Sequence, residues 1–273
     1  MFLLTFWMFE TAHLQNGLDF FYEKKGDGPV TVLISGLGHD HHIWAPLIER
    51  LPLSFGSTLC FDARGIGQSG DDGANLTTRI MAEDVIQLLD ALAIPKANVV
   101  GISLGSLVTQ ELAAHFPDRV ERVVLLATTM GGSAHIAPDQ EVLAYFATAG
   151  QMDEKTRLAK GLQLAMSESS LKDAQVQERV GQVFSGPSAG PEIRRRQGIA
   201  GMFFDSTGWI NQIHAPVLVL HGAKDRVVPV VNGENLARKI GASYHVQSDI
   251  GHLMILENPE WVAAQLVDFF QKD

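Results

Sequence analysis

The strongest limit on the fold of this chain is a regular alternation of continuous apolar runs with helical patterns. The apolar runs lie at residues 30–36, 57–63, 97–103, 120–128, 215–222 and 243–249. Because most of them are continuous rather than alternating, we expect strands that are covered on both faces. Between the runs, apolar residues recur at helical spacing, as in Leu88, Leu89 and Leu92 before a proline. The alternation predicts an α/β protein with a doubly wound, mostly parallel sheet.

Two further strands are expected before the first of these runs. The turn residues Asn16 and Gly17 lie between two strand-like segments in FETAHLQNGLDFFYEKKG, residues 9–26, which predicts a hairpin. With the six apolar runs, this makes a sheet of about eight strands. The apolar residues 1–7 lack a positive flank, a cleavage site and the length of a membrane span, so we expect an optional extension that is neither signal nor anchor.

The alternation breaks once, between residues 130 and 210, where helical patterns occur without a convincing strand. We therefore expect residues 1–129 and 211–273 to form the core and residues 130–210 to form a helical cap insertion. Several large apolar side chains are expected to line a substrate pocket beneath this cap: Trp44, Met202, Phe203, Phe204 and Trp209.

The charge balance argues against a nucleic-acid partner. The formal net charge is −10, and the longest basic run is Arg194–Arg196. That run could guide an anionic substrate or form a solvated helix face. Cys60, the single cysteine, lies in an apolar run and is expected in the core, so no disulfide can form within the chain. We expect a cytoplasmic protein with no membrane partner.

Ser103 is flanked by Gly101 and Gly105 where an apolar run becomes a helical pattern. Glycine is needed where the backbone turns too sharply for a Cβ atom or where another element packs too close. A serine held at such a turn has an exposed hydroxyl that faces the positive end of the following helix, which favours a nucleophile. The motif alone also fits a serine that merely caps the helix.

Three predicted strand ends together supply a serine, a carboxylate and a histidine. Ligands of open parallel sheets bind at the carboxyl ends of the strands, where Ser103, Asp225 and His252 are expected. A serine hydroxyl attacks an acyl carbon only when a base takes its proton and a third group orients that base. His252 can serve as the base and Asp225 as the acid.

This Ser, Asp, His order, together with G-x-S-x-G, resembles the α/β-hydrolase family. The resemblance covers nearly the whole core, through SGLG (35–38), FDARGIGQSG (61–70), GISLG (101–105), HGAKDRVVP (221–229) and GHLMILENP (251–259). It implies that Ser103 is the nucleophile, Asp225 the acid and His252 the base. It also implies an oxyanion hole built from the backbone N–H groups of Leu37 and Leu104, and a helical cap.

One position departs from the family pattern, because Ser35-Gly36 stands where the family usually has His-Gly. A backbone donor does not depend on that side chain, so the oxyanion prediction is retained. A serine here, followed by Leu-Gly and Trp44, is similar to enol-lactonase-like members and to cofactor-free perhydrolase relatives.

The resulting expectation is a serine hydrolase that cleaves a carboxylic ester or lactone through an acyl-enzyme on Ser103, without a cofactor. A perhydrolase or a carbon–carbon bond hydrolase with the same triad is an alternative within enzymes. A ligand-binding receptor on the same fold is the alternative from another class. The partner is expected to be a small molecule, and the oligomeric state is left open.

The cluster His39–His42 raises a metal interpretation, but consecutive side chains point in different directions and lack helical ligand spacing. We expect no metal there, with Asp40 capping the following helix and the histidines near its exposed first turn. The glycines of DARGIGQSG lack the spacing of a phosphate-binding loop, so we expect a tight turn held by Asp62 and Arg64.

Overall fold

The structure is a computed structural model that describes residues 7–186 and 189–271. The expected extension over residues 1–7 lies outside the described residues, except that the backbone of Trp7 begins the first strand.

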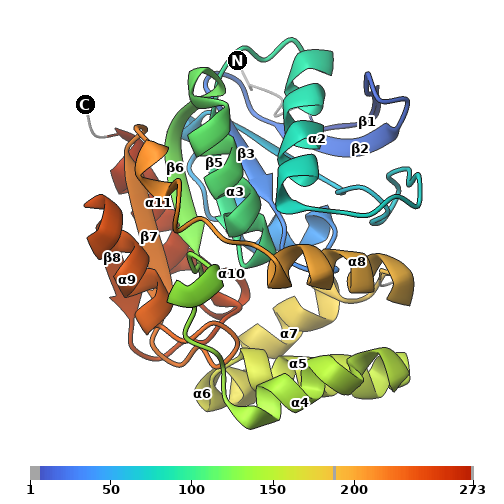
Figure 1. Cartoon of the computed structure of the whole chain (residues 1–273), viewed down its shortest axis with the longest axis vertical. Helices are drawn as coiled ribbons and strands as arrows, with labels where there is room; N and C mark the ends of the chain where they lie inside the picture. The colour runs from blue at the N-terminus through green and yellow to red at the C-terminus, as the bar shows by residue number, and fades with distance from the viewer. Residues whose placement is uncertain (1–6, 187–188, 272–273) are drawn as a thin grey trace.

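The chain forms one eight-stranded sheet (Figure 1). Its strands are β1 (Trp7–His13), β2 (Asp19–Lys25), β3 (Val30–Ile34), β4 (Ser57–Phe61), β5 (Ala97–Ile102), β6 (Val120–Leu126), β7 (Val217–Gly222) and β8 (Ser243–Gln247). The spatial order is β1-β2-β4-β3-β5-β6-β7-β8, with β2 antiparallel to β1 and β4 and all other pairs parallel. Every residue of β4 and β7 is buried, as continuous apolar runs predict. The predicted doubly wound sheet is confirmed.

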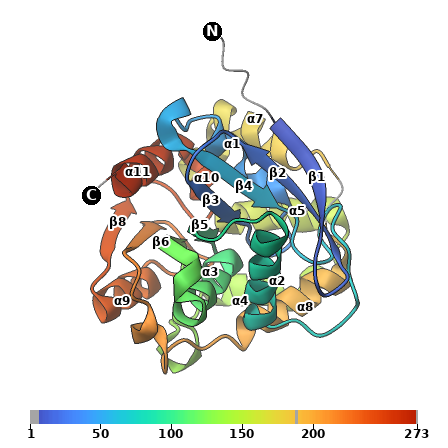
Figure 2. The ribbon, with the colours of Figure 1, turned by 90° about the horizontal axis from the view of Figure 1, so that it is seen from above.

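Helices cover both faces of the sheet (Figure 2). The core helices are α1 (Ala45–Ile48), α2 (Thr78–Ala91), α3 (Leu104–His115), α9 (Val231–Ile240), α10 (Met254–Glu257) and α11 (Pro259–Gln271). One apolar core joins α2, α3 and α9 to the sheet, and a second joins α1, α10 and α11 to the opposite face. Within the described ranges, no helix has the length and apolar character needed to cross a bilayer.

Among the described residues, five helices lie between β6 and β7. They are α4 (Gln140–Thr148), α5 (Glu154–Ala165), α6 (Glu168–Lys172), α7 (Ala174–Val183) and α8 (Pro191–Met202), and we call them the inserted helices. Figure 1 shows them grouped along one end of the sheet. Apart from a single bridge between Gly131 and Asp205, the described part of this segment contains no strand pairing.

Short 3-10 turns complete the chain. They are η1 (His41–Trp44), η2 (Leu53–Phe55), η3 (Pro117–Arg119), η4 (Gly132–Ala134), η5 (Ala149–Gln151) and η6 (Ile210–Gln212).

Candidate active site

Ser103 lies in a strained turn between β5 and α3. Its φ is 55° and its ψ is −121°, a conformation that non-glycine residues rarely adopt. A Cβ atom on Gly101 would lie 2.2 Å from the carbonyl oxygen of Gly105, and one on Gly105 would lie 2.1 Å from that of Ile34. Both glycines are therefore required by backbone packing. The Ser103 side chain makes no capping hydrogen bond to α3, so the structure does not support the alternative in which this serine only caps the helix.

Backbone hydrogen bonds hold the neighbouring strand ends side by side. The Ser103 N–H donates to Leu126 O at 2.9 Å, and the Ala127 N–H donates to Leu220 O at 3.1 Å. The loop that follows β7 is fixed in turn, because the Lys224 N–H donates to Ile250 O at 2.9 Å. The loops that carry Ser103, Asp225 and His252 thus leave the same end of the sheet, as predicted.

Asp225 and His252 form a buried pair. Oδ2 of Asp225 lies 2.8 Å from Nδ1 of His252, and each residue is only 6% exposed. Burial raises the pKa of Asp225, but the charge of His252 and the hydrogen bonds from His221 and His252 more than offset burial and lower that pKa to about 2. Because an ionised carboxylate can only accept, the proton of neutral His252 lies on Nδ1. Nε2 of His252 is then available as a proton acceptor.

His221 is a second imidazole on the same carboxylate. Its Nε2 lies 2.9 Å from Val228 O and 3.3 Å from Oδ2 of Asp225, and the side chain is fully buried. Both neighbours are acceptors, so Nε2 carries the proton. Nδ1 of His221 has no hydrogen-bond partner among the described residues. The sequence alone assigned this histidine no part in the site, although it begins the same motif as Asp225.

Glu257 anchors the loop that carries His252. Its carboxylate accepts from the Gly251 N–H at 2.9 Å and from the Ser167 N–H at 2.9 Å, and Glu257 is itself buried. The His252 N–H donates to Ala165 O at 2.6 Å. Ala165 and Ser167 flank the junction of α5 and α6, so the histidine loop is attached to the inserted helices. In the sequence, Glu257 is visible only as a glutamate five residues after His252. Its partner Ser167 lies 90 residues earlier, and the sequence does not show that the two meet.

The two predicted oxyanion donors belong to segments next to Ser103. Leu104 follows it directly, as the first residue of α3. A Cβ atom on Gly36, which precedes Leu37, would lie 3.4 Å from Cβ of Ser103. Within residues 7–186 and 189–271, the backbone N–H groups of Leu37 and Leu104 make no hydrogen bond to another protein group. They are free to bind an oxygen.

His39 adds a neutral imidazole beside this site. Its Cδ2 atom would lie 3.7 Å from a Cβ atom on Gly36. Its ring meets that of Phe184 edge-on, with centroids 5.4 Å apart. Burial, together with the charge of His252, lowers the pKa of His39 to about 4, although Asp40 raises it. His39 is therefore neutral at pH 7.

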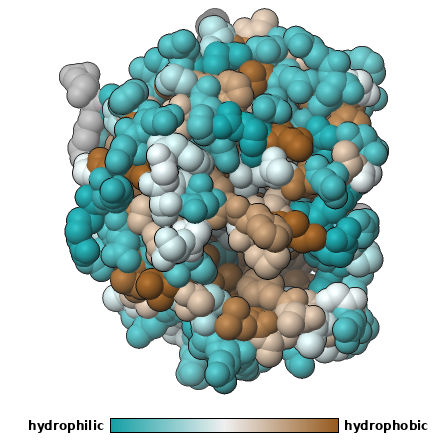
Figure 3. Space-filling model, in the orientation of Figure 1, coloured by the Kyte–Doolittle hydropathy of each residue, from teal (hydrophilic) through white to brown (hydrophobic). Residues whose placement is uncertain are grey.

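The structure does not bring the five expected pocket residues together. Trp44 is fully buried, and its indole N–H donates to the Ser35 hydroxyl at 3.0 Å. Phe204 is 3% exposed and meets Trp209 edge-on, whereas Met202 and Phe203 are 71% and 76% exposed. Figure 3 shows a hollow bordered by apolar residues in the lower half of the molecule, where Figure 1 places the inserted helices.

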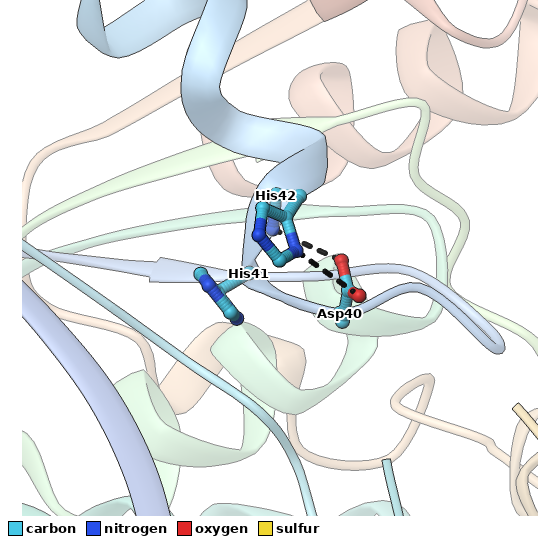
Figure 4. Close-up of side chains that lie close together, drawn as sticks. All are labelled: Asp40, His41 and His42. Carbon is cyan, nitrogen blue, oxygen red and sulfur yellow. Dashed lines mark hydrogen bonds and ion pairs between the residues drawn. The ribbon is translucent and has the colours of Figure 1, made fainter. Parts of the chain in front are cut away.

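Asp40, His41 and His42 lie close together, and interactions within the group join only His42 to Asp40 (Figure 4). Asp40 caps η1 by accepting from the His42 N–H at 3.0 Å, as predicted. His42 is exposed, also as predicted, but the expectation that His41 lies near an exposed turn is wrong. His41 is 3% exposed because its Nδ1 atom lies 2.7 Å from Oδ1 of Asp62, on a different strand end. One ligand atom from each of the three residues lies within 4.8 Å of the others, and the absence of a metal stays a prediction.

The turn after β4 is held as expected. Oδ2 of Asp62 accepts from the Gln68 N–H at 2.9 Å. Arg64 is buried against Asp84, with Nε 2.9 Å from Oδ2. A Cβ atom on Gly67 would lie 2.1 Å from Oδ2 of Asp62, which explains the glycine.

The basic run on α8 does not form a single solvated face. Arg195 is exposed and pairs with Glu192 on the same helix. Arg196 is 4% exposed and pairs with Asp71 of the core. Neither a substrate-guiding role nor a solvated helix face therefore describes Arg196, which pairs with a carboxylate that is distant in the sequence.

Comparison with known proteins agrees with this architecture. The sequence model of the alpha/beta hydrolase fold matches residues 29–259. Among curated relatives, a poly(3-hydroxyalkanoate) depolymerase of Ectopseudomonas oleovorans is 27% identical, with 98% of this chain and 94% of the relative covered. The 3-oxoadipate enol-lactonase 2 of Acinetobacter baylyi is 28% identical, with 86% of each chain covered. The solved structure of an enol-lactonase from Burkholderia xenovorans superposes with a TM-score of 0.83 at 26% identity, covering 96% of this chain and 100% of the other. Because the family's sequence model matches most of its length, the chain belongs to the α/β-hydrolase family.

Proposed function

We propose that this hydrolase cleaves a carboxylic ester or lactone through an acyl-enzyme on Ser103. The observation that carries the proposal is the shared sheet end, which carries both a strained serine and a histidine held by an ionised carboxylate. The relatives support the bond type, since an enol-lactonase and a poly(3-hydroxyalkanoate) depolymerase are named for a lactone and a polyester.

In the first half-reaction, Oγ of Ser103 attacks the carbonyl carbon while Nε2 of His252 takes the hydroxyl proton. Asp225 stays ionised and stabilises the imidazolium that forms. The N–H groups of Leu37 and Leu104 bind the oxygen on which negative charge develops. His252 then gives its proton to the leaving alkoxide, and the alcohol departs.

In the second half-reaction, His252 takes a proton from water, and the hydroxide attacks the acyl carbon on Ser103. The tetrahedral intermediate uses the same two N–H donors. Its collapse returns the proton from His252 to Oγ of Ser103 and releases the acid. Every proton in this cycle moves through one imidazole, so the proposal requires no cofactor.

The test compares the parent with Ser103→Ala on a series of p-nitrophenyl esters and simple lactones. Removal of the nucleophile is expected to lower kcat by about a thousandfold or more, with an unchanged circular dichroism spectrum. Ser185 is an exposed serine on the inserted segment, so Ser185→Ala serves as the matched control and is expected to keep parental activity. A serine-directed phosphonate is expected to label Ser103, as read by mass spectrometry.

The alternatives give different results in the same assays. Labelling of another serine, or parental turnover by folded Ser103→Ala, would reject the mechanism. Steady cleavage of a carbon–carbon bond or peracid formation at rates above ester hydrolysis would reassign the reaction while keeping the triad. One turnover of product without recycling would indicate a receptor.

A further inference from the structure

Helix α8 packs against the side chains of both residues predicted as oxyanion donors. Gly198 and Gly201 are three residues apart and therefore share one face of the helix. A Cβ atom on Gly198 would lie 3.7 Å from Cδ1 of Leu37, and one on Gly201 would lie 3.4 Å from Cδ1 of Leu104. The inserted segment thus contacts the two residues whose N–H groups are the predicted oxyanion donors.

Gln197, on the same helix, makes a hydrogen bond to the loop that carries Leu37. Its Oε1 atom accepts from the Gly38 N–H at 2.8 Å, and the Gln197 side chain is 1% exposed. The two residues are 159 positions apart in the sequence. A buried, well-aligned side-chain acceptor on a loop N–H fixes the orientation of that peptide plane.

The geometry of the loop explains why this peptide matters. The His39 N–H donates to Gly36 O at 3.2 Å and closes a four-residue turn, Gly36–His39. The same peptide plane holds Gly36 O and the Leu37 N–H, which point in opposite directions because the bond is trans. The next plane holds the Gly38 N–H that Gln197 binds. Gly38 has φ +74°, so the turn has the left-handed third residue of a type II turn.

A flip of the Leu37–Gly38 peptide would change the turn type, because it rotates the Leu37 carbonyl and the Gly38 N–H together, while the Leu37 N–H belongs to the preceding peptide plane. In the flipped form, the Gly38 N–H would no longer face Gln197, and the buried amide oxygen of Gln197 would lose its donor. Gln197 therefore holds the turn in one form and fixes its position next to the peptide that carries the Leu37 N–H.

Helix α8 is itself fixed to the core next to Gln197. The Arg196 guanidinium is buried, pairs with Asp71 and donates to Ala74 O at 2.7 Å. Both Asp71 and Ala74 belong to the loop that follows β4. The position of Gln197 is thus set by an anchor one residue away.

We propose that Gln197 is a positioning residue of the oxyanion hole, which is complete only when α8 is seated on the loop Gly36–His39. The inference rests on the proposed ester or lactone hydrolysis. Oxyanion donors act on charge that develops in the transition state, so a misdirected Leu37 N–H lowers kcat and leaves substrate binding almost unchanged. Gln197 does not titrate and, among the described residues, makes no hydrogen bond to Asp225 or His252, so the pH dependence of the rate is expected to stay the same.

The test uses Gln197→Leu and Gln197→Met, which lack the acceptor and have similar size, so that at least one is expected to fold. Arg195→Gln is the matched control, because Arg195 lies on the same helix but is exposed and, within the part of the chain that the structure describes, pairs only with Glu192. Esters hydrolysed by the parent are assayed for kcat, KM and the pH profile. A boronic acid, which forms a tetrahedral anion on Ser103, is assayed as an oxyanion mimic. Hydrogen exchange of a peptide spanning residues 36–39 reports the Gly38 N–H directly.

In both Gln197 variants we expect kcat to fall about tenfold to a hundredfold, which is below the loss typical for deleting an oxyanion donor outright. KM is expected to stay within about twofold, affinity for the boronic acid to fall with kcat, and exchange at residues 36–39 to become faster. The acid limb of the pH profile should not move.

Two results would overturn the inference. One is a folded Gln197 variant with parental kcat and parental boronic-acid affinity. The other is a lower melting temperature with unchanged kcat, which would show a purely structural role. A parent that neither hydrolyses esters or lactones nor reacts with a phosphonate at Ser103 would instead reject the proposed function, and this inference with it.

Discussion

Oδ2 of Asp225 lies 2.8 Å from Nδ1 of His252, and both side chains are buried. The carboxylate is held on its other oxygen by two backbone donors, since Oδ1 accepts from the N–H groups of Val227 and Val228 at 2.9 and 2.8 Å. Full hydrogen bonding of both oxygens is what allows a charge to persist in the interior. The pair is therefore a source of stability as well as a part of the proposed site.

Asp225 should make the protein less stable in acid. Its pKa is about 2 in the folded protein, against about 3.9 in an unfolded chain. Because the folded pKa is the lower one, the stabilisation is present above about pH 4 and is lost as the pH falls toward about 2; its size is ~2 kcal/mol. Urea unfolding at pH 5 and at pH 3 measures the first part of this loss of stability, about half of it.

The Asp225→Asn variant is the control for that measurement. Asparagine has no charge to lose, so its free energy of unfolding should fall less between the two pH values than that of the parent. An equal fall in both proteins would show that other carboxylates carry the acid sensitivity. The same variant should lower kcat/KM by about a thousandfold, because the imidazole loses its correct tautomer.

His221 should influence the basicity of His252 through the carboxylate of Asp225, which both imidazoles contact. Its Nε2–H is 3.3 Å from Oδ2 of Asp225, the same oxygen that binds His252. His221→Leu removes that donor, so more of the carboxylate charge acts on His252. We expect the acid limb of the kcat/KM profile to move to higher pH, and kcat/KM at its plateau to fall about tenfold through misplacement of Asp225.

The conservative variant separates this role from simple packing. In His221→Gln, the amide nitrogen can replace the Nε2 donor, so the acid limb should return toward its parental position. If the pH profile moves in neither variant while both lose thermal stability, His221 has only a packing role against Gly233. A Cβ atom on Gly233 would lie 2.3 Å from Nδ1 of His221.

The turn at Ser103 tolerates no side chain at its first glycine. A Cβ atom on Gly101 would lie 2.2 Å from Gly105 O and 2.3 Å from Oγ1 of Thr109, so the backbone of α3 would have to move. We expect Gly101→Ala to lower the free energy of unfolding by about 3 kcal/mol or more. Gly181 in α7 faces open space, so Gly181→Ala should instead raise stability by about 0.5–1 kcal/mol. Equal effects of the two substitutions in urea unfolding would contradict the packing argument.

Local patterns in the sequence predicted the fold because strand burial leaves a local signature. The run at residues 57–63 became β4, all of it buried, and the turn Asn16-Gly17 joins β1 to β2. The order of motifs along the chain likewise predicted the Asp225–His252 pair, since each residue follows a recognisable strand.

What sequence reasoning missed depends on partners that are distant in the chain. His41 is buried because Asp62 reaches it from another strand end, and nothing local distinguishes it from exposed His42. Arg196 belongs to a run of three arginines, yet only the docking of α8 selects it for Asp71. Gln197 carries no motif at all. Such contacts follow from how the inserted helices dock, which periodicity does not encode.

Adjacent aromatic residues at the end of α8 provide a sharp test of that docking. Phe204 is 3% exposed, meets Trp209 edge-on with centroids 5.8 Å apart, and accepts the Gly132 N–H at its carbonyl, whereas Phe203 is 76% exposed. We expect Phe204→Ala to lower the free energy of unfolding by about 3–5 kcal/mol, because it leaves a cavity. Phe203→Ala should change it by no more than about 0.5 kcal/mol. Urea unfolding of the two variants, purified in parallel, gives both values. Similar losses at both positions, or a larger loss at Phe203, would mean that the segment after α8 docks on the core with its opposite face.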